Sequence, residues 1–163
     1  MNKVAKFEKV SFDRYNLDTN GHRIEYENIK LPVRATKKSS GHDFFLPHDI
    51  TIPFNGSVTV ATGIRSILND NEFLLIIPRS SLGFKYGITL ANTVGDIDAD
   101  YSDSDNEGHI FVKLINSSPL AEGKDITLKK GEKFCQGIIL NYMVAEGAES
   151  NVDRNGGVGS TGK

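Results

Sequence analysis

Apolar and polar residues alternate along several short stretches of this chain. The alternation is clear at residues 50–52 (Ile-Thr-Ile), 58–60 (Val-Thr-Val) and 110–115, and Gly, Pro or Asn stands at the breaks between such stretches. A period of two residues is typical of β-strands with one buried face, because successive side chains of a strand point to opposite sides. The pattern therefore predicts an all-β protein.

Two continuous apolar runs depart from this alternation. They are residues 73–77 (FLLII) and 137–140 (GIIL). Runs of this kind are typical of strands that are covered on both faces. We expect both strands to lie in the core, with their second face covered either inside a sandwich or at a subunit contact.

Helical patterns are nearly absent. Only Ser80 to Tyr86 predicts one or two helical turns, which would open at a serine N-cap and end before Gly87. An initial strand is expected within residues 3–12. Short strands at near-regular spacing with one short helix predict a distorted jelly roll, or a similar double-sheet β-barrel.

The length and net charge of the chain limit the number of domains and the kinds of partner that can be expected. With 163 residues and a net charge of −2, we expect one domain over residues 1–145, followed by a flexible glycine-rich tail over 146–163. The charge gives no support for binding nucleic acid or a membrane surface, and no apolar stretch is long enough to cross a bilayer. The start has no apolar core of a signal peptide, so a cytoplasmic location is expected.

The only cysteine, Cys135, cannot form an internal disulfide. Its apolar neighbours predict a small buried side chain rather than a nucleophile. The four histidines show no metal-ligand spacing, so no dedicated metal site is expected. The acidic segment 102–108 (SDSDNEG) is predicted to be a loop in solvent.

Candidate chemistry gathers between residues 78 and 101. The guanidinium of Arg79, next to the hydroxyls of Ser80 and Ser81, suits the oxygens of a phosphate. A following Gly-x-Ile-Asp-x-Asp-Tyr hairpin brings the carboxylate of Asp98 close to the ring of Tyr101. The two groups indicate a nucleotide whose phosphates meet the first loop while its sugar and base meet the second.

Five segments in order now identify a resemblance. They are residues 39–44 (SSGHDF), 78–88, 92–101, 131–136 (GEKFCQ) and 156–162 (GGVGSTG). Together they resemble the homotrimeric, all-β deoxyuridine triphosphate nucleotidohydrolase (dUTPase) family, over the chain from about residue 30 onward. The resemblance implies a β-clip fold, a homotrimer with sites shared between subunits, and hydrolysis of dUTP to dUMP and pyrophosphate with Mg²⁺ on the triphosphate.

The resemblance also implies roles for the hairpin. Asp98 would deprotonate the attacking water, and Tyr101 would stack under the deoxyribose and exclude a 2′-hydroxyl. Asn92, Gly95 and Ile97 would meet the edge of the uracil. Without the resemblance, Asp98 is more typical of a turn and Tyr101 of the core, and a turn residue and a binding residue are about equally expected at Asn92.

The phosphates would meet a second set of residues. The resemblance assigns Arg79, Ser80, Ser81 and Gly83 to the α- and β-phosphates, and Gln136 to the phosphates or the water. Asp43 would sit behind them, where it either reaches Mg²⁺ through a water and pairs with Arg79 or forms a structural salt bridge.

The tail would close over the site of a neighbouring subunit as a lid. The tail residues that would contact the nucleotide are Arg154, Val158, Gly159, Ser160 and Thr161. Val158 stands where the family has Phe, so uracil stacking must be weaker or come from another ring, such as Phe84 or Tyr86. Residues 157–163 also fit G-x-x-x-x-G-K, but the chain stops before the Ser or Thr and the helix that a Walker A loop requires.

Two other functions are compatible with this fold. A dCTP deaminase has a similar Arg-Ser-Ser turn but uses a glutamate where this chain has Lys113. A regulatory protein of the phage type could use the same fold to bind a partner, and retention of Asp98 argues against binding as its only role. Release of pyrophosphate from dUTP, of ammonia from dCTP, or of neither would separate the three.

Overall fold

The computed structural model describes residues 5–148, 150–154 and 156 of the chain. Its strands are β1 (Lys6–Lys9), β2 (Val33–Arg34), β3 (His42–Phe45), β4 (Ile50–Ile52), β5 (Gly56–Ala61), β6 (Ile64–Ile67), β7 (Glu72–Pro78), β8 (Thr89–Leu90), β9 (Gly95–Asp98), β10 (Phe111–Asn116), β11 (Ile126–Leu128) and β12 (Lys133–Asn141). Its helices are α1 (Phe12–Thr19), α2 (Arg23–Glu27) and α3 (Ser80–Tyr86), with short 3-10 helices at Ala99–Asp103 and Pro119–Ala121. The predicted all-β class is confirmed, and the three alternating stretches lie in β4, β5 and β10.

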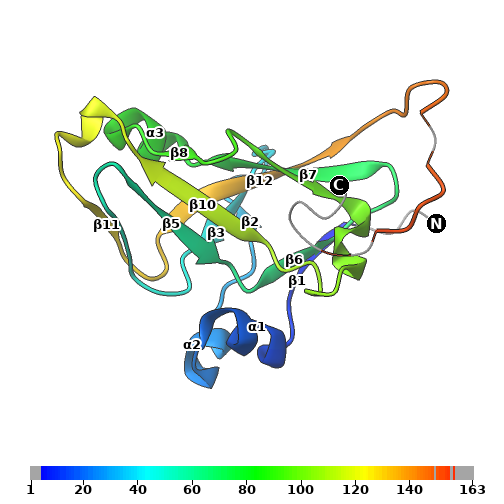
Figure 1. Ribbon diagram of the computed structural model, residues 1–163, viewed down its shortest axis with the longest axis horizontal. Coiled ribbons are helices and arrows are strands. Elements are labelled where there is room, and N and C mark those ends of the chain that lie inside the picture. Colours follow the sequence, from blue (N-terminus) through cyan, green and yellow to red (C-terminus); the bar gives the residue numbers. More distant parts are fainter. Residues whose placement is uncertain (1–4, 149, 155, 157–163) are drawn as a thin grey trace.

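The strands form two larger antiparallel sheets and two small ones. A five-stranded sheet has the order β2-β3-β12-β7-β9, and a three-stranded sheet has the order β5-β10-β8. The pairs β1-β6 and β11-β4 complete the fold (Figure 1). Side chains from both larger sheets meet in one core, as predicted for a double-sheet fold.

The two continuous apolar runs lie side by side at the centre of the five-stranded sheet. β7 pairs with β12 over seven residues, from Phe73 opposite Leu140 to Pro78 opposite Cys135, with Glu72 opposite Asn141. The inward residues Leu74 and Ile76 are buried, whereas Leu75 on the other face is half-buried. The core therefore covers one face of these strands, and the second face is only partly covered within a single chain.

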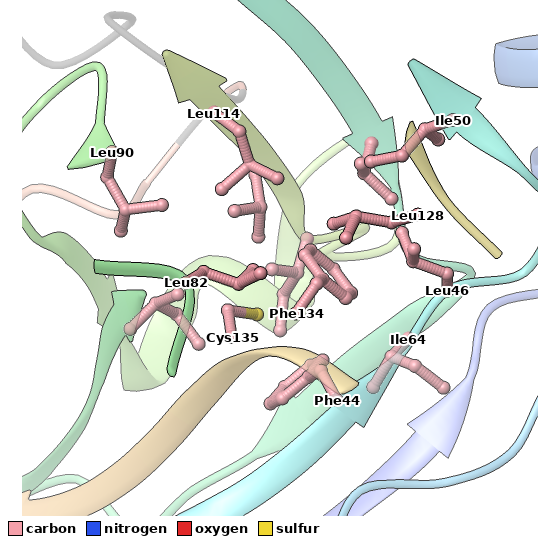
Figure 2. Close-up of a cluster of buried hydrophobic side chains, with 14 of the residues drawn as sticks. Phe44, Leu46, Ile50, Ile64, Leu82, Leu90, Leu114, Leu128, Phe134 and Cys135 are labelled. Atoms are coloured by element: carbon pink, nitrogen blue, oxygen red, sulfur yellow. The ribbon is translucent and has the colours of Figure 1, made fainter. Parts of the chain in front are cut away.

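The core contains large side chains from distant parts of the sequence. Figure 2 shows Phe44 of β3 and Phe134 and Cys135 of β12 among Leu and Ile side chains from other strands, from α3 and from the segment after β3. Phe44 is 1% exposed and Phe134 is fully buried. Cys135 is also fully buried, which confirms its prediction as a small apolar side chain.

The structure adds two helices that the sequence pattern did not predict. α1 begins after Ser11, whose side chain accepts a hydrogen bond from the backbone N–H of Arg14, and it ends at Asn20 with a φ of 53°. Only Tyr15 of α1 is buried, and α2 has no buried residue. Helices this short with so few buried residues lack the apolar periodicity by which a helix is recognised. Figure 1 shows both on one side of the sheets.

α3 occupies the predicted position with a different start. Arg79, not a serine, is the N-cap residue, and its side chain makes no capping hydrogen bond. Gly87 ends the helix as expected, with a φ of 67°. A Cβ atom there would also clash with the side chain of Ser118, so glycine is required on two grounds. Among the described residues, no helix has the length and apolar character needed to cross a bilayer.

Replacement of Phe44 by Ala tests the core. The variant should lose about 3–5 kcal/mol of the free energy of unfolding, because a buried aromatic ring leaves a cavity that neighbouring strands cannot fill. Urea unfolding at a fixed protein concentration measures this loss. Phe84→Ala is the matched control, since Phe84 is 89% exposed and its loss should change stability by less than about 0.5 kcal/mol. Equal effects of the two variants would contradict the assignment of Phe44 to the core.

Candidate active site

A pocket of about 540 Å³ lies between the two larger sheets and the turn that follows β9. Several strands contribute to its wall. The lining residues are Thr59, Ile76, Leu90, Ala91, Asn92, Gly95, Asp96, Ile97, Asp98, Tyr101, Phe111, Val112, Lys113 and Arg154. One pocket is therefore lined by the residues predicted to meet the sugar (Tyr101), the uracil edge (Asn92, Gly95 and Ile97) and the water (Asp98), whereas Gln136 does not line it.

Asp98 is the last residue of β9 and lies on the rim of this pocket. Its side chain is 54% exposed, and it also lines a neighbouring pocket of about 570 Å³ that contains Arg65, Asp70 and Tyr142. An exposed carboxylate between two hollows can be reached by both a ligand and solvent.

Tyr101 lies in the 3-10 helix that follows β9 and is only 5% exposed. Its hydroxyl donates to the backbone carbonyl of His109 at 2.9 Å and accepts from Nδ2 of Asn106 at 2.8 Å. The ring is therefore held at its outer end by hydrogen bonds while it contributes to the pocket wall.

Arg154 of the tail contacts the pocket of its own chain. Its guanidinium pairs with Asp98, donates to Asp100 at 2.7 Å and lies 5.7 Å from the centre of the Tyr101 ring. The tail was expected to cover the site of a neighbouring subunit, which a single chain does not test; within this chain, Arg154 lies beside Asp98. Opposite charges account for the contact, because two carboxylates, of Asp98 and Asp100, flank one cation.

The segment from Asn92 to Ile97 is not a paired hairpin, in contrast to the prediction. β8 pairs with β10 whereas β9 pairs with β7, so the segment crosses from one sheet to the other. The turn is held locally by a hydrogen bond from the backbone N–H of Val94 to the carbonyl of Asn92, at 2.6 Å. Backbone groups of this crossing lie at the pocket and can face the edge of a base.

Asp96 lines the same pocket and carries a perturbed charge. Burial and the nearby carboxylate of Asp98 raise the pKa of Asp96, and the cation of Arg154 offsets only part of this rise. The pocket therefore holds carboxylates that repel one another, which makes it favourable for a cation to remain close.

The predicted phosphate-binding residues lie elsewhere in the chain. Arg79 precedes α3, and Ser80, Ser81 and Gly83 are in its first turns. β7 separates them from Asp98: Phe73 pairs with Asp98, and Arg79 follows six residues later, which is about 20 Å along an extended strand. Figure 1 shows α3 at the opposite end of the molecule from the yellow-green turn near residue 100. One chain does not bring the two sets together.

Asp43 and Gln136 lie next to each other on β3 and β12, near Arg79. The side-chain amide of Gln136 donates to Asp43 at 3.0 Å, and the ammonium of Lys133 lies 2.7 Å from the other carboxylate oxygen. Burial raises the pKa of Asp43, but the hydrogen bonds from Lys133 and Gln136 and the charge of Arg79 outweigh it, so the pKa lies below its usual value. Of the two readings of Asp43, the structure supports the salt bridge, with Lys133 as the partner.

Within the described residues, no three His, Cys, Asp or Glu side chains are grouped as metal ligands would be. Val158, Gly159, Ser160 and Thr161 lie outside the described residues, and the structure does not test their predicted contacts.

Comparison with known proteins decides the family. The dUTPase family model matches residues 27–162. The chain belongs to the dUTPase family. It is 34% identical over 143 residues to the deoxyuridine 5′-triphosphate nucleotidohydrolase of Lactococcus lactis, with 85% of this chain and 93% of the relative covered.

Solved dUTPases share the fold. The dUTPase of Streptococcus mutans has a TM-score of 0.68 and 29% identity, with 87% of this chain and 99% of that chain covered. A mutant dUTPase of phage phi11 of S. aureus, described as coordinating a structural Mg(II) ion, has a TM-score of 0.66 and 16% identity, with 92% of this chain and 98% of that chain covered.

Sequence reasoning missed the residues around Tyr101. The segment 102–108 was expected in solvent, but Ser104 and Gly108 are buried, and Asn106 bonds to the Tyr101 hydroxyl. The polar composition of segment 102–108 did not indicate this role, because the sequence does not show whether a polar side chain bonds to water or to another residue. His109 was noted only as lacking a metal-ligand spacing, and nothing in the sequence indicated its burial.

Lys133→Met in this dUTPase family member should destabilise the fold at neutral pH by about 1–3 kcal/mol, because it leaves the Asp43 carboxylate buried with fewer donors. Since the folded pKa of Asp43 is lowered from 3.8, the stabilisation is fully present above about pH 4 and is lost as the pH falls through the lower, folded pKa. Between pH 5 and pH 3, the free energy of unfolding should therefore fall less in the variant than in the parent, because the variant has already lost the pair between Lys133 and Asp43. Urea unfolding across this range measures the difference, and Lys129→Met, which removes a pair with Asp49 that is screened by solvent, should change the curve much less.

Proposed function

We propose that this dUTP diphosphatase of the dUTPase family cleaves dUTP between the α- and β-phosphates, with Asp98 acting on the attacking water. The observation that carries the proposal is the common pocket of Asp98 and Tyr101. Its volume of about 540 Å³ lies within the range of roughly 300–1,000 Å³ that is usual for small-molecule sites. A nucleoside in this pocket would have its sugar against the Tyr101 ring and its 5′-oxygen towards the Asp98 carboxylate.

In the reaction, a water oxygen bonds to the α-phosphorus, and the bond from that phosphorus to the bridging oxygen of the β-phosphate breaks. The bond electrons leave with pyrophosphate, and the water proton passes to Asp98. A positioned carboxylate contributes about 10²–10⁴ in rate, and the rest comes from alignment and charge stabilisation around the phosphates.

Tyr101 and the crossing from β8 to β9 would select the substrate. The buried ring of Tyr101 occupies one wall, so an added 2′-hydroxyl would meet it. Backbone groups near Asn92, Gly95 and Ile97 would bond to the uracil edge, and a cytosine would leave some of them unpaired. Lys113, which stands where a deaminase has its glutamate, is an exposed residue of β10 at the pocket wall, and its ammonium cannot accept a proton as that carboxylate does.

The phosphate-binding residues would come from another subunit of a homotrimer. The separation of about 20 Å between Arg79 and Asp98 along β7 supports this arrangement, because one nucleotide cannot easily span it within a chain. In a cyclic trimer, Arg79, Ser80, Ser81, Gly83 and Gln136 of one subunit would face the Asp98 pocket of the next.

Magnesium would enter with the nucleotide as Mg–dUTP. The described residues provide no cluster of protein ligands for the ion, and Mg²⁺ commonly binds through substrate phosphates and water. In that state it neutralises phosphate charge, and the residues of this chain bind and orient the complex.

The tail would act as a lid when substrate is present. Arg154, which pairs with Asp98 and Asp100 in the structure, would move to the phosphates and release Asp98 for the water. Gly159, Ser160 and Thr161 would add donors, and Val158 would cover the base without stacking on it. Contacts with the nucleotide would offset the chain entropy that residues 146–163 lose when they close over the site.

Asp98→Asn should reduce the release of pyrophosphate from dUTP by at least about 10²-fold, because an amide cannot accept the water proton. Binding of a non-hydrolysable dUTP analogue, measured by calorimetry, should remain within a few-fold of the parent. Asp100→Asn is the matched control, since its carboxylate also pairs with Arg154 but is not assigned to the water. Substantial turnover by the Asp98 variant would remove it from the role of base.

Mixed oligomers test whether the site is shared. Arg79→Ala and Asp98→Asn should each be inactive alone, and subunits of both, refolded together in equal amounts, should recover about a quarter of the parent activity in a cyclic trimer with random assembly. The recovery arises because some sites then take an intact Asp98 from one subunit and an intact Arg79 from the next. Refolding Asp98→Asn with the double variant should recover nothing. If the first mixture is also inactive while mixed trimers form, the site is not shared in this way.

A further inference from the structure

The loop 102–108 fixes the outer end of Tyr101. Asn106 donates from Nδ2 to the Tyr101 hydroxyl at 2.8 Å, and its own Oδ1 accepts the backbone N–H of Gly108 at 3.1 Å. The Tyr101 hydroxyl then donates to the backbone carbonyl of His109 at 2.9 Å. The position of the ring therefore depends on where residues 106–109 are held.

Both ring nitrogens of His109 make hydrogen bonds, and these hold the side chain in place. The backbone N–H of Gly63 donates to Nε2 at 2.8 Å, so Nδ1 carries the proton and donates to the carboxylate of Asp18 at 2.6 Å. The His109 side chain is fully buried, and burial lowers its pKa, which keeps the ring in this neutral form. Arg14, one turn before Asp18, donates to the same carboxylate at 2.8 Å.

α1 is attached to this loop at both of its ends. Near its C-terminal end, Asp18 contacts His109 as described. At its N-terminal end, the hydroxyl and backbone N–H of Ser11 donate to the carboxylate of Glu107 at 2.6 and 2.7 Å. The family model matches residues 27–162, so α1 lies outside the region that this model matches.

We propose that α1 positions Tyr101, through Asp18 and His109, and thereby sets how strongly the enzyme rejects a 2′-hydroxyl. The inference rests on the proposed contact between Tyr101 and the deoxyribose. Asp18, His109 and Asn106 are positioning residues in this scheme, since none of them lines the pocket.

The physical reason is the small size of the group that is rejected. A ring that can shift by a fraction of an ångström makes room for one hydroxyl, whereas a ring held by two hydrogen bonds must break or lengthen one of them first. Loss of the Asp18 carboxylate leaves the buried Nδ1–H of His109 without this acceptor, and the residue must move or change its protonated nitrogen. Either change displaces the carbonyl that holds Tyr101.

Asp18→Ala is the principal test. The ratio of kcat/KM for dUTP to kcat/KM for UTP should fall about tenfold, a loss that corresponds to roughly one hydrogen bond. Most of the fall should come from faster use of UTP, with kcat for dUTP within about threefold of the parent. A purely structural effect would lower activity on both nucleotides in proportion and leave the ratio unchanged.

Three further variants make the result specific. Asp18→Asn keeps an oxygen that can accept from Nδ1–H, so it should restore the ratio to within about threefold of the parent. Asp13→Ala, on the exposed face of the same helix, should leave the ratio unchanged. Asn106→Ala removes the second hydrogen bond of the Tyr101 hydroxyl and should also lower the ratio. This result does not depend on whether Asp18→Ala folds. Thermal unfolding of each variant shows which of them fold.

Tyr101→Ala separates this inference from the proposed function. If Tyr101→Ala lowers the ratio while folded Asp18→Ala and Asn106→Ala keep it, α1 does not position the ring and the inference is wrong. If Tyr101→Ala also keeps the ratio, the proposed role of Tyr101 fails and the inference fails with it. A lowered ratio in all three, with rescue by Asp18→Asn, supports the inference.

Discussion

The antiparallel pairing of β7 with β9 on one side and β12 on the other determines where Asp98 and Arg79 lie relative to each other. β7 begins next to the end of β9, where Asp98 stands, and it ends beside Arg79. Because side chains alternate along a strand, a slip of one residue in this register would turn Leu74 and Ile76 out of the core and displace Asp98 from the pocket. The core that stabilises the sheet therefore also fixes the distance between the two halves of the site.

Charge is arranged differently at the two ends of β7. At the Asp98 end, several carboxylates share the single arginine of the tail, so the local balance is negative and a cation is attracted. At the other end, Asp43 is matched by Lys133, with Arg79 close by, so the local balance suits an anion. This contrast agrees with a site that places the water-activating group in one subunit and the phosphate-binding groups in another.

The sequence was sufficient to predict those parts of the structure that follow from a local pattern of residues. Alternation predicted β4, β5 and β10, and the apolar runs predicted the central strands. The motif around Asp98 and Tyr101 predicted residues that do line one pocket. The contacts of residues 102–109 could not be predicted, because Glu107 bonds to a residue 96 positions away and His109 to one 91 positions away. The crossing between β8 and β9 was taken for a hairpin, because its residues are typical of a tight turn and strand partners are chosen by the whole sheet.

The fully buried thiol of Cys135 sits where β12 meets β3 and β7, and burial raises its pKa well above the usual value. Such a sulfur is protonated and shielded, so alkylating reagents cannot reach it while the sheet is closed. As the lone cysteine of the chain, it offers one label per polypeptide, and its rate of modification reports how often the middle of the barrel opens.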